Sequence, residues 1–138
     1  MKKLRVAFGM YDNNLLSDKH FGESEFYAIY DVYEDHHYEF VERRENNAKN
    51  VEEKEHGDPR KLKAVIQTLN DVDILAAFRM GPNYIQIKKN SNKVPFITGT
   101  RKLEEALVKV SENFNKLWEE KNSKLEVAFS DSKGQHLP

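Results

Sequence analysis

The order in which strand-like and helix-like segments follow one another limits the possible folds of this 138-residue chain more than any other feature. Three segments rich in aromatic and β-branched residues come first, at 4–10, 26–33 and 38–43, and such segments are typical of strands. Helix-like and strand-like segments then alternate. The order β-β-β-α-β-α-β-α predicts an α/β protein with one mixed five-stranded sheet and helices on both faces, a three-layer α/β/α fold.

Proline and glycine mark where the helices of the second half begin. Asp58-Pro59 places proline in a first helical turn, where a missing N–H donor costs nothing, and Gly81-Pro82 precedes a shorter helix. Strands are predicted at 72–78 and 93–98. Pro95 indicates either that the strand at 93–98 lies at a sheet edge or that Pro95 is at the start of the strand, because proline cannot donate to a neighbouring strand.

The sequence predicts a single domain over residues 1–122, ending in a long helix that begins near residue 103. Residues 123–138 are predicted to form a C-terminal arm or tail. Leu125, Val127 and Phe129 occupy alternate positions in it, which favours a further strand or an extended segment.

Composition excludes several classes of site. The chain contains no cysteine, so disulfides, zinc fingers, thiol catalysis and cysteine-ligated iron–sulfur sites are ruled out. No segment is apolar and long enough to span a membrane, and the Met-Lys-Lys start lacks the apolar region of a signal peptide. These features predict a cytoplasmic protein with no membrane partner.

The formal net charge of −1 conceals two oppositely charged regions. Residues 31–58 carry ten acidic and four basic residues, whereas residues 59–103 carry nine basic and two acidic ones. The basic region is either a solvated surface or a surface that faces an anionic ligand. The acidic hairpin region offers an alternative function, that of a protein–protein adaptor.

Several chemically useful residues are predicted to meet at one edge of the sheet. If the first, fourth and fifth strands are parallel, their carboxyl ends lie on one edge, where open α/β sheets bind ligands. The loops at that edge carry His20, His56, Arg79–Met80 and Thr100–Arg101. We call this edge the rim.

The rim residues indicate binding of an anion. A loop histidine such as His20, within His20-Phe21-Gly22, can offer a ring nitrogen to a metal or an anion. His56-Gly57 and Arg79–Pro82 each lie just before a predicted helix N-terminus, where free N–H groups favour negative charge. Gly81 either belongs to this possible anion-binding site or only allows a tight turn. A small phosphorylated or other organic anion is one possible ligand.

Metal-dependent nuclease activity is disfavoured, and the sequence predicts no nucleic-acid partner. Two-metal phosphate chemistry needs several carboxylates clustered at strand centres and ends. The first strand carries no acid, Asp12 follows it, and Asp73 lies at the opposite end of the fourth strand from the rim.

Three motifs, in order along the chain, resemble a known family. The segment Asp18–Val32 contains the His-Phe-Gly signature, Arg79-Met80-Gly81-Pro82 forms a Gly-Pro turn, and Gly99–Ala106 starts a helix with Gly-Thr and Glu-Glu-Ala. Together with the strand Val72–Ala76 they resemble the dinitrogenase iron–molybdenum cofactor biosynthesis family. The resemblance covers residues 4 to about 110.

This resemblance implies a ribonuclease H-like domain that carries an iron–sulfur or molybdenum-containing cluster and is not an enzyme. The implied site consists of His20, Phe21, Gly22 and the turn Arg79–Pro82, with His20 as the metal ligand. Because the chain has no cysteine, the cluster would be held by histidine, methionine, backbone amides and positive charge. A protein that donates or accepts the cluster is the implied partner. The oligomeric state stays open.

Overall fold

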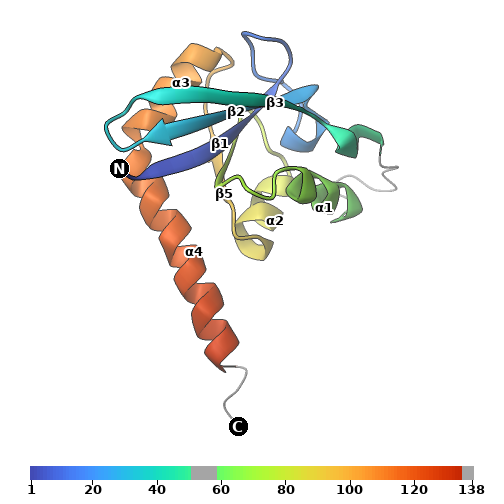
Figure 1. Ribbon diagram of the computed structural model, residues 1–138. Coiled ribbons are helices and arrows are strands. Elements are labelled where there is room, and N and C mark those ends of the chain that lie inside the picture. The colour runs from blue at the N-terminus through green and yellow to red at the C-terminus, as the bar shows by residue number, and fades with distance from the viewer. Residues whose placement is uncertain (51–58, 135–138) are drawn as a thin grey trace.

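Five strands form one mixed sheet in the computed structural model, which describes residues 1–50 and 59–134 (Figure 1). The strand order is β3-β2-β1-β4-β5. The first three strands form an antiparallel meander, and β4 and β5 run parallel to β1. The bounds are Lys3–Met10 for β1, Phe26–Tyr33 for β2, Tyr38–Glu45 for β3, Ile74–Ala77 for β4 and Val94–Ile97 for β5.

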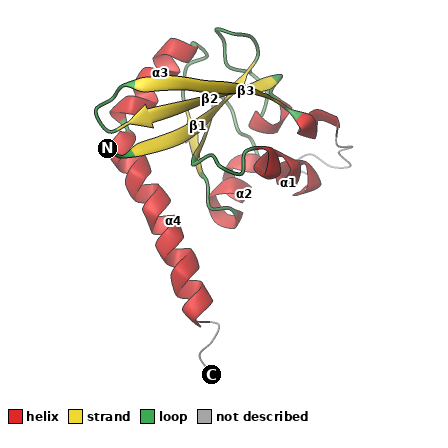
Figure 2. Ribbon diagram, in the orientation of Figure 1, coloured by secondary structure: helices red, strands yellow, loops and turns green. Residues whose placement is uncertain are grey.

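Helices cover both faces of the sheet, which confirms the predicted three-layer fold (Figure 2). One core lies between the sheet and α3–α4, and a second between the sheet and α1–α2. Within the described ranges, no helix is long and apolar enough to cross a membrane. The helix bounds are Pro59–Thr68 for α1, Asn83–Asn90 for α2, Leu103–Glu112 for α3 and Phe114–Gly134 for α4.

The central strand β1 contributes side chains to both cores. Val6 and Phe8 pack toward α3–α4, whereas Ala7 faces α1–α2, and all three are fully buried. Successive strand residues point to opposite faces, so a strand covered on both sides must be apolar throughout. This explains the run without charged residues at 6–10, whereas Arg5, near the start of the strand, is partly exposed and pairs with Asp31 and Asp71.

The predicted long helix from about residue 103 to about residue 122 is wrong, because the chain bends at Asn113 between α3 and α4. The backbone N–H of Asn113 caps the end of α3, and its side-chain amide donates to the carbonyl of Lys109 at 2.8 Å. Asparagine side chains compete with the helix for backbone groups and so favour helix ends. After the bend, Phe114 and Leu117 are buried against the sheet.

The strand or extended segment predicted at Leu125–Phe129 is also wrong, because these residues lie in α4. Positions 125, 128 and 129 also have the spacing of one helix face, so a short alternating pattern does not discriminate between a strand and a helix. The rest of the predicted arm or tail is helical as far as Gly134, and residues 135–138 lie outside the described residues. A domain boundary after residue 122 stays a prediction.

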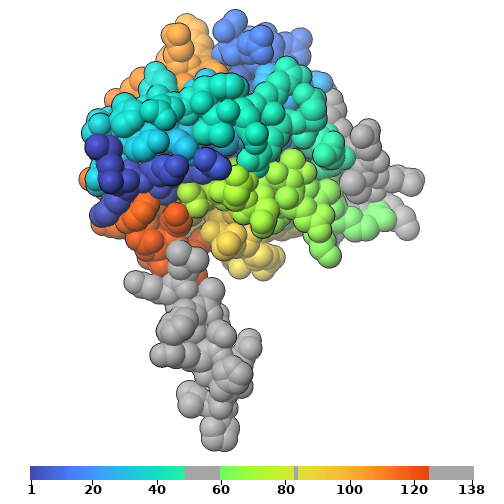
Figure 3. Space-filling model, viewed as in Figure 1, coloured from blue at the N-terminus to red at the C-terminus, as the bar shows by residue number. Residues whose placement is uncertain are grey.

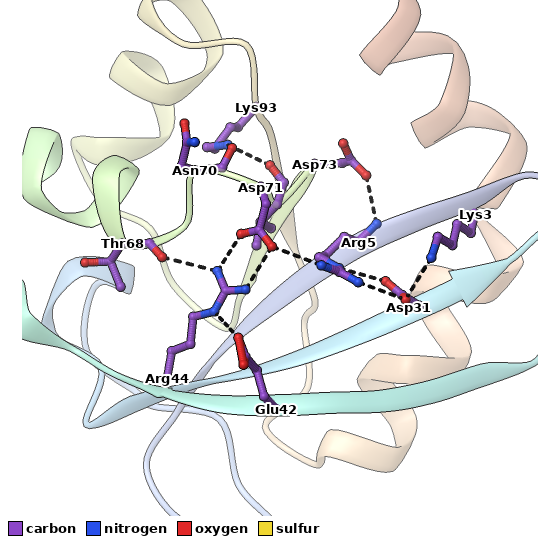
Figure 4. A network of polar contacts seen from close by, with 11 residues as sticks. Lys3, Arg5, Asp31, Glu42, Arg44, Thr68, Asn70, Asp71, Asp73 and Lys93 are labelled. Atoms are coloured by element: carbon purple, nitrogen blue, oxygen red, sulfur yellow. Dashed lines mark hydrogen bonds and ion pairs between the residues drawn. The ribbon is translucent and has the colours of Figure 1, made fainter.

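A chain of ion pairs crosses the sheet, from Lys3 and Asp31 at the end opposite the rim to Arg44, which pairs with Tyr27 near the rim end of β3 (Figure 4). Asp31 accepts hydrogen bonds from Lys3 and Arg5, and Arg5 also donates to Asp71 at 3.0 Å. Arg44 from β3 donates two hydrogen bonds to Asp71. The network therefore connects β3, β2 and β1 to the segment that precedes β4.

The network predicts a pH-dependent contribution to stability. Hydrogen bonds from Arg44, and then from Arg5, hold the pKa of Asp71 well below its usual range, although partial burial opposes them. A carboxylate with a lowered pKa stabilises the fold fully above its unfolded-state pKa of about 4. This contribution declines below that value and is lost as the pH falls through the lowered native-state pKa. Because Asp71 is half-exposed, we expect Asp71→Asn to lower the free energy of unfolding by only about 1 kcal/mol at pH 7.

Urea denaturation at pH 7 and pH 3 tests this prediction, with the exposed Asp18→Asn as the control. The difference between Asp71→Asn and the unmodified protein should shrink at pH 3. An equal difference at both pH values would contradict the assignment.

Candidate functional site

The rim forms where the chain leaves the three parallel strands. The loop after β1 leads to His20, and a short 3-10 helix at Phe21–Glu23 follows. The backbone N–H of Leu16 donates to the carbonyl of Arg101 at 2.7 Å, and Nε of Arg101 donates back to the carbonyl of Leu16 at 2.9 Å. These bonds join the loop after β1 to the segment that starts α3, and Figure 3 shows the two side by side at the top of the molecule.

His20 meets the turn after β4, although the two are far apart in sequence. Residues 20 and 79 form an isolated parallel β-bridge. The imidazole of His20 also lies directly against Gly81: a Cβ on Gly81 would be 2.5 Å from both Cε1 and Nε2. Gly81 has a φ of +57°, a conformation that favours glycine. The predicted convergence of His20 with Arg79 and Gly81 is therefore confirmed.

Three side chains hold the turn that follows His20. The hydroxyls of Tyr27 and Ser24 donate to the carbonyl of Phe21 at 3.0 and 2.8 Å. The side-chain amide of Asn46 donates to the carbonyls of Gly22 and Ser24 at 2.9 and 2.8 Å. All three side chains are buried, and burial raises the pKa of Tyr27, so its hydroxyl stays a donor. The turn is thus fixed by the core rather than by the loop itself.

Close packing against β1 reinforces this turn. Gly9 lies opposite Ser24, and a Cβ at Gly9 would come within 2.3 Å of the Ser24 hydroxyl oxygen. The ring of Phe21 packs on that of Tyr27 with centroids 4.9 Å apart. Phe21, the middle residue of the His-Phe-Gly signature, therefore anchors the turn. His20, which is only partly buried, faces the rim.

The other predicted site residues take different positions. Phe21 and Gly22 are buried, and the side chain of Met80 is 1% exposed in the core beneath α1 and α2. The thioether of Met80 is thus a packing group, whereas the side chain of Arg79 is exposed at the rim. His56 lies outside the described residues.

The predicted site did not include Ser24, Tyr27 or Asn46. A signal for Asn46 was present in the hairpin: a turn at residues 34–37 pairs Phe26 with Glu45 and so brings residue 46 to the start of β2. In the structure Phe26 does pair with Glu45, although a register shift between Ile29 and Tyr30 interrupts the hairpin. Without the pairing of Phe26 with Glu45, Asn46 would be predicted to be an ordinary loop residue.

Replacement of Asn46 should loosen the turn. Asn46→Ala leaves the buried carbonyls of Gly22 and Ser24 without a donor, and each unsatisfied buried group costs about 1–3 kcal/mol. We expect the free energy of unfolding in urea to fall by about 2 kcal/mol or more. The exposed Asn13→Ala should cause almost no change. A similar loss for both variants would contradict the anchoring role.

The described residues contain no group of three or more histidine, cysteine, aspartate or glutamate side chains that could chelate a metal ion. Among its described residues, the rim instead offers the imidazole of His20, the exposed guanidinium of Arg79 and the partly buried guanidinium of Arg101. Such a set can bind an anionic group through one nitrogen ligand and positive charge.

The strand order and the placement of the helices define an α/β domain of the ribonuclease H-like class. A family model described as dinitrogenase iron–molybdenum cofactor matches residues 2–113. The chain belongs to this family, as the motifs around His20, Gly81 and Gly99 indicate. No curated protein is significantly similar to it in sequence. The match ends at the bend between α3 and α4, so α4 lies outside it.

Proposed function

We propose that the protein is a non-enzymatic carrier that binds an iron–sulfur or molybdenum-containing cluster at the rim. The observation that carries this proposal is the position of the His20 imidazole, held against Gly81 at the end of a turn that buried side chains fix. The family match supports a cargo related to the iron–molybdenum cofactor.

The composition of the rim supports a transferable cargo rather than a permanent cofactor. The chain has no thiolate to ligate iron, so His20 is the proposed metal ligand, and Arg79 and Arg101 balance negative charge. One ligand and two cations form a weaker site than the four thiolates that commonly hold iron–sulfur clusters. A carrier must release its cargo, and a weak site makes release possible.

Anaerobic reconstitution tests the proposal. Protein incubated without oxygen with an iron–sulfur or iron–molybdenum cluster, and then desalted, should retain colour and iron. A parallel thermal-shift series with nucleotides and inorganic phosphate under metal-free conditions tests the organic-anion alternative. Stabilisation by those anions without cluster uptake would contradict the carrier proposal.

A further inference from the structure

The strand β3 forms one of the two edges of the sheet, and it is a long one (Figure 2). It has eight residues and no proline, whereas β5 at the other edge has four residues that include Pro95. Every residue of β3 except Arg44 is exposed. An edge strand of this length presents a row of backbone N–H and C=O groups with which a further strand can pair.

The hydrogen bonds of the β2–β3 hairpin determine which backbone groups of β3 face outward. The N–H of Tyr33 donates to the carbonyl of His37 at 2.9 Å, so the odd-numbered residues of β2 bond to β3. Opposite residues of an antiparallel pair alternate between bonded and non-bonded pairs. The β3 partners of the even-numbered residues of β2 therefore direct their backbone groups away from β2. These partners are Tyr38, Phe40, Arg43 and Glu45.

Apolar side chains lie beside these outward backbone groups. Phe40 is 59% exposed and Tyr38 is 39% exposed, and their ring centroids lie 5.4 and 6.2 Å from that of Tyr30. A hollow of about 630 Å³ separates Tyr30 and Tyr38 from the first turn of α3. Exposed apolar surface at a free strand edge is typical of a protein–protein contact.

One antiparallel register joins all four outward residues to the same residues of a second copy of this chain. It places Phe40 opposite Arg43 of the second copy and Tyr38 opposite Glu45, and the reverse pairs follow from two-fold symmetry. The four side chains point to the face that bears α3 and α4, because their partners in β2 belong to that core, so they match across the interface. Any shift from this register leaves at least two of the four residues unpaired.

The charges of β3 agree with the same register. Glu39 lies opposite Arg44 of the second copy, and no two like charges lie directly opposite each other. Pairing residue 38 with 40 would instead place Glu39 opposite Glu39, and pairing 43 with 45 would place Arg44 opposite Arg44, and like charges in these positions are destabilising. Because Arg44 already binds Asp71 and Glu42, charge selects the register here, and the backbone supplies the hydrogen bonds.

We propose that β3 is a self-association surface, along which two copies of this chain pair antiparallel into one continuous sheet. Strand addition uses main-chain hydrogen bonds for affinity and alternate side chains for specificity. Arg43, whose guanidinium stacks 3.8 Å from the ring centroid of Phe26, would also cover the exposed ring of Phe40 of the second copy. Eight paired residues extend over about 27 Å, which is a small interface, so we expect a weak dimer.

The proposed dimer leaves both rims open. The carboxyl end of β3 lies near the rim, and antiparallel pairing places it beside the amino end of β3 in the second copy. The two rims therefore lie at opposite ends of the joined sheet. The proposal does not rest on cluster binding, and its test uses the protein without a cluster.

Sedimentation equilibrium between about 5 and 500 μM tests the proposal. The mean mass of the unmodified protein should rise with concentration from that of one chain toward that of two. Phe40→Pro should raise the dissociation constant about tenfold or more, because it removes an outward N–H and leaves the hydrogen bonds to β2 intact. The matched control is Ile97→Pro, at an exposed position on the other edge, and it should dimerise normally.

Disulfide trapping tests the register itself, because the natural chain contains no cysteine. A mixture of the single variants Tyr38→Cys and Glu45→Cys should form a mixed disulfide, since opposite residues of a bonded pair have Cα atoms about 5.5 Å apart. Each variant alone should form far less, because residue 38 lies about 20 Å or more from residue 38 of the second copy.

Three results would overturn the proposal. These are a mass that stays at one chain over the whole concentration range, a dimer that Ile97→Pro weakens while Phe40→Pro does not, and trapping that is no greater for the mixture than for either variant alone. Circular dichroism shows whether each variant is folded. If Phe40→Pro does not fold, the trapping experiment decides.

Discussion

The His20→Ala variant, reconstituted without oxygen, is expected to retain less than about a tenth of the cluster that the unmodified protein binds. Loss of a residue that merely supports a metal ligand weakens metal binding about 10- to 100-fold, so loss of the ligand itself should be at least as severe. The chain has no cysteine that could substitute. Iron content and visible absorbance after desalting provide the measurement.

A second histidine offers a matched control for this experiment. His37 lies at the tip of the β2–β3 hairpin, stacked on Tyr33, at the far end of β2 from the turn that bears His20. His37→Ala should bind the cluster like the unmodified protein. If His20→Ala keeps its fold, as judged by circular dichroism, and also binds the cluster normally, the site assignment is wrong.

The Gly81→Ala variant should lose cluster binding while it stays folded. A Cβ at this position would lie 2.5 Å from the imidazole of His20, so the ring must move away. The left-handed conformation of residue 81 adds a strain of about 1 kcal/mol for a residue other than glycine. We therefore expect a modest fall in the free energy of unfolding and a loss of cluster binding nearly as large as that of His20→Ala.

Gly99 separates backbone strain from the displacement of His20. Its φ is +69°, close to that of Gly81, but the nearest atom to an added Cβ is the ammonium of Lys109 at 3.3 Å, the end of a flexible side chain. Gly99→Ala should therefore show a similar loss of stability with normal cluster binding. If both variants lose the cluster equally, strain in the rim loops, rather than the contact with His20, controls binding.

The prediction of the inner strands from local patterns succeeded because the apolar pattern of each reflects its own burial, whereas β3 is exposed along almost its whole length. The run at residues 6–10 is apolar on both faces because β1 is covered on both faces, and Pro95 lies in an edge strand, as its missing donor requires. The prediction failed at Asn113, where one polar residue ends a helix that the apolar spacing would continue. It failed again after residue 122, where alternating and helical spacing coincide.

The candidate site was only partly accessible to such reasoning. Parallel strands place their carboxyl ends together, so the meeting of His20 with the turn at residues 79–81 followed from topology alone. The positions of Phe21 and Met80 did not follow, because a side chain beside a functional loop can point to the rim or to the core. Ser24 and Tyr27 remained hidden because their partner is the backbone carbonyl of Phe21, and such a contact leaves no trace in a sequence pattern.

Local chemistry in the chain was sufficient to establish the order of elements, the absence of thiolate ligands and the edge of the sheet that bears the rim. These properties depend on residue type and on spacing along the chain. Only the folded structure decided that the His20 ring rests on Gly81 and that buried donors hold its turn. Such contacts join segments that are far apart in the sequence, so they depend on how the folded chain packs and not on local residue patterns.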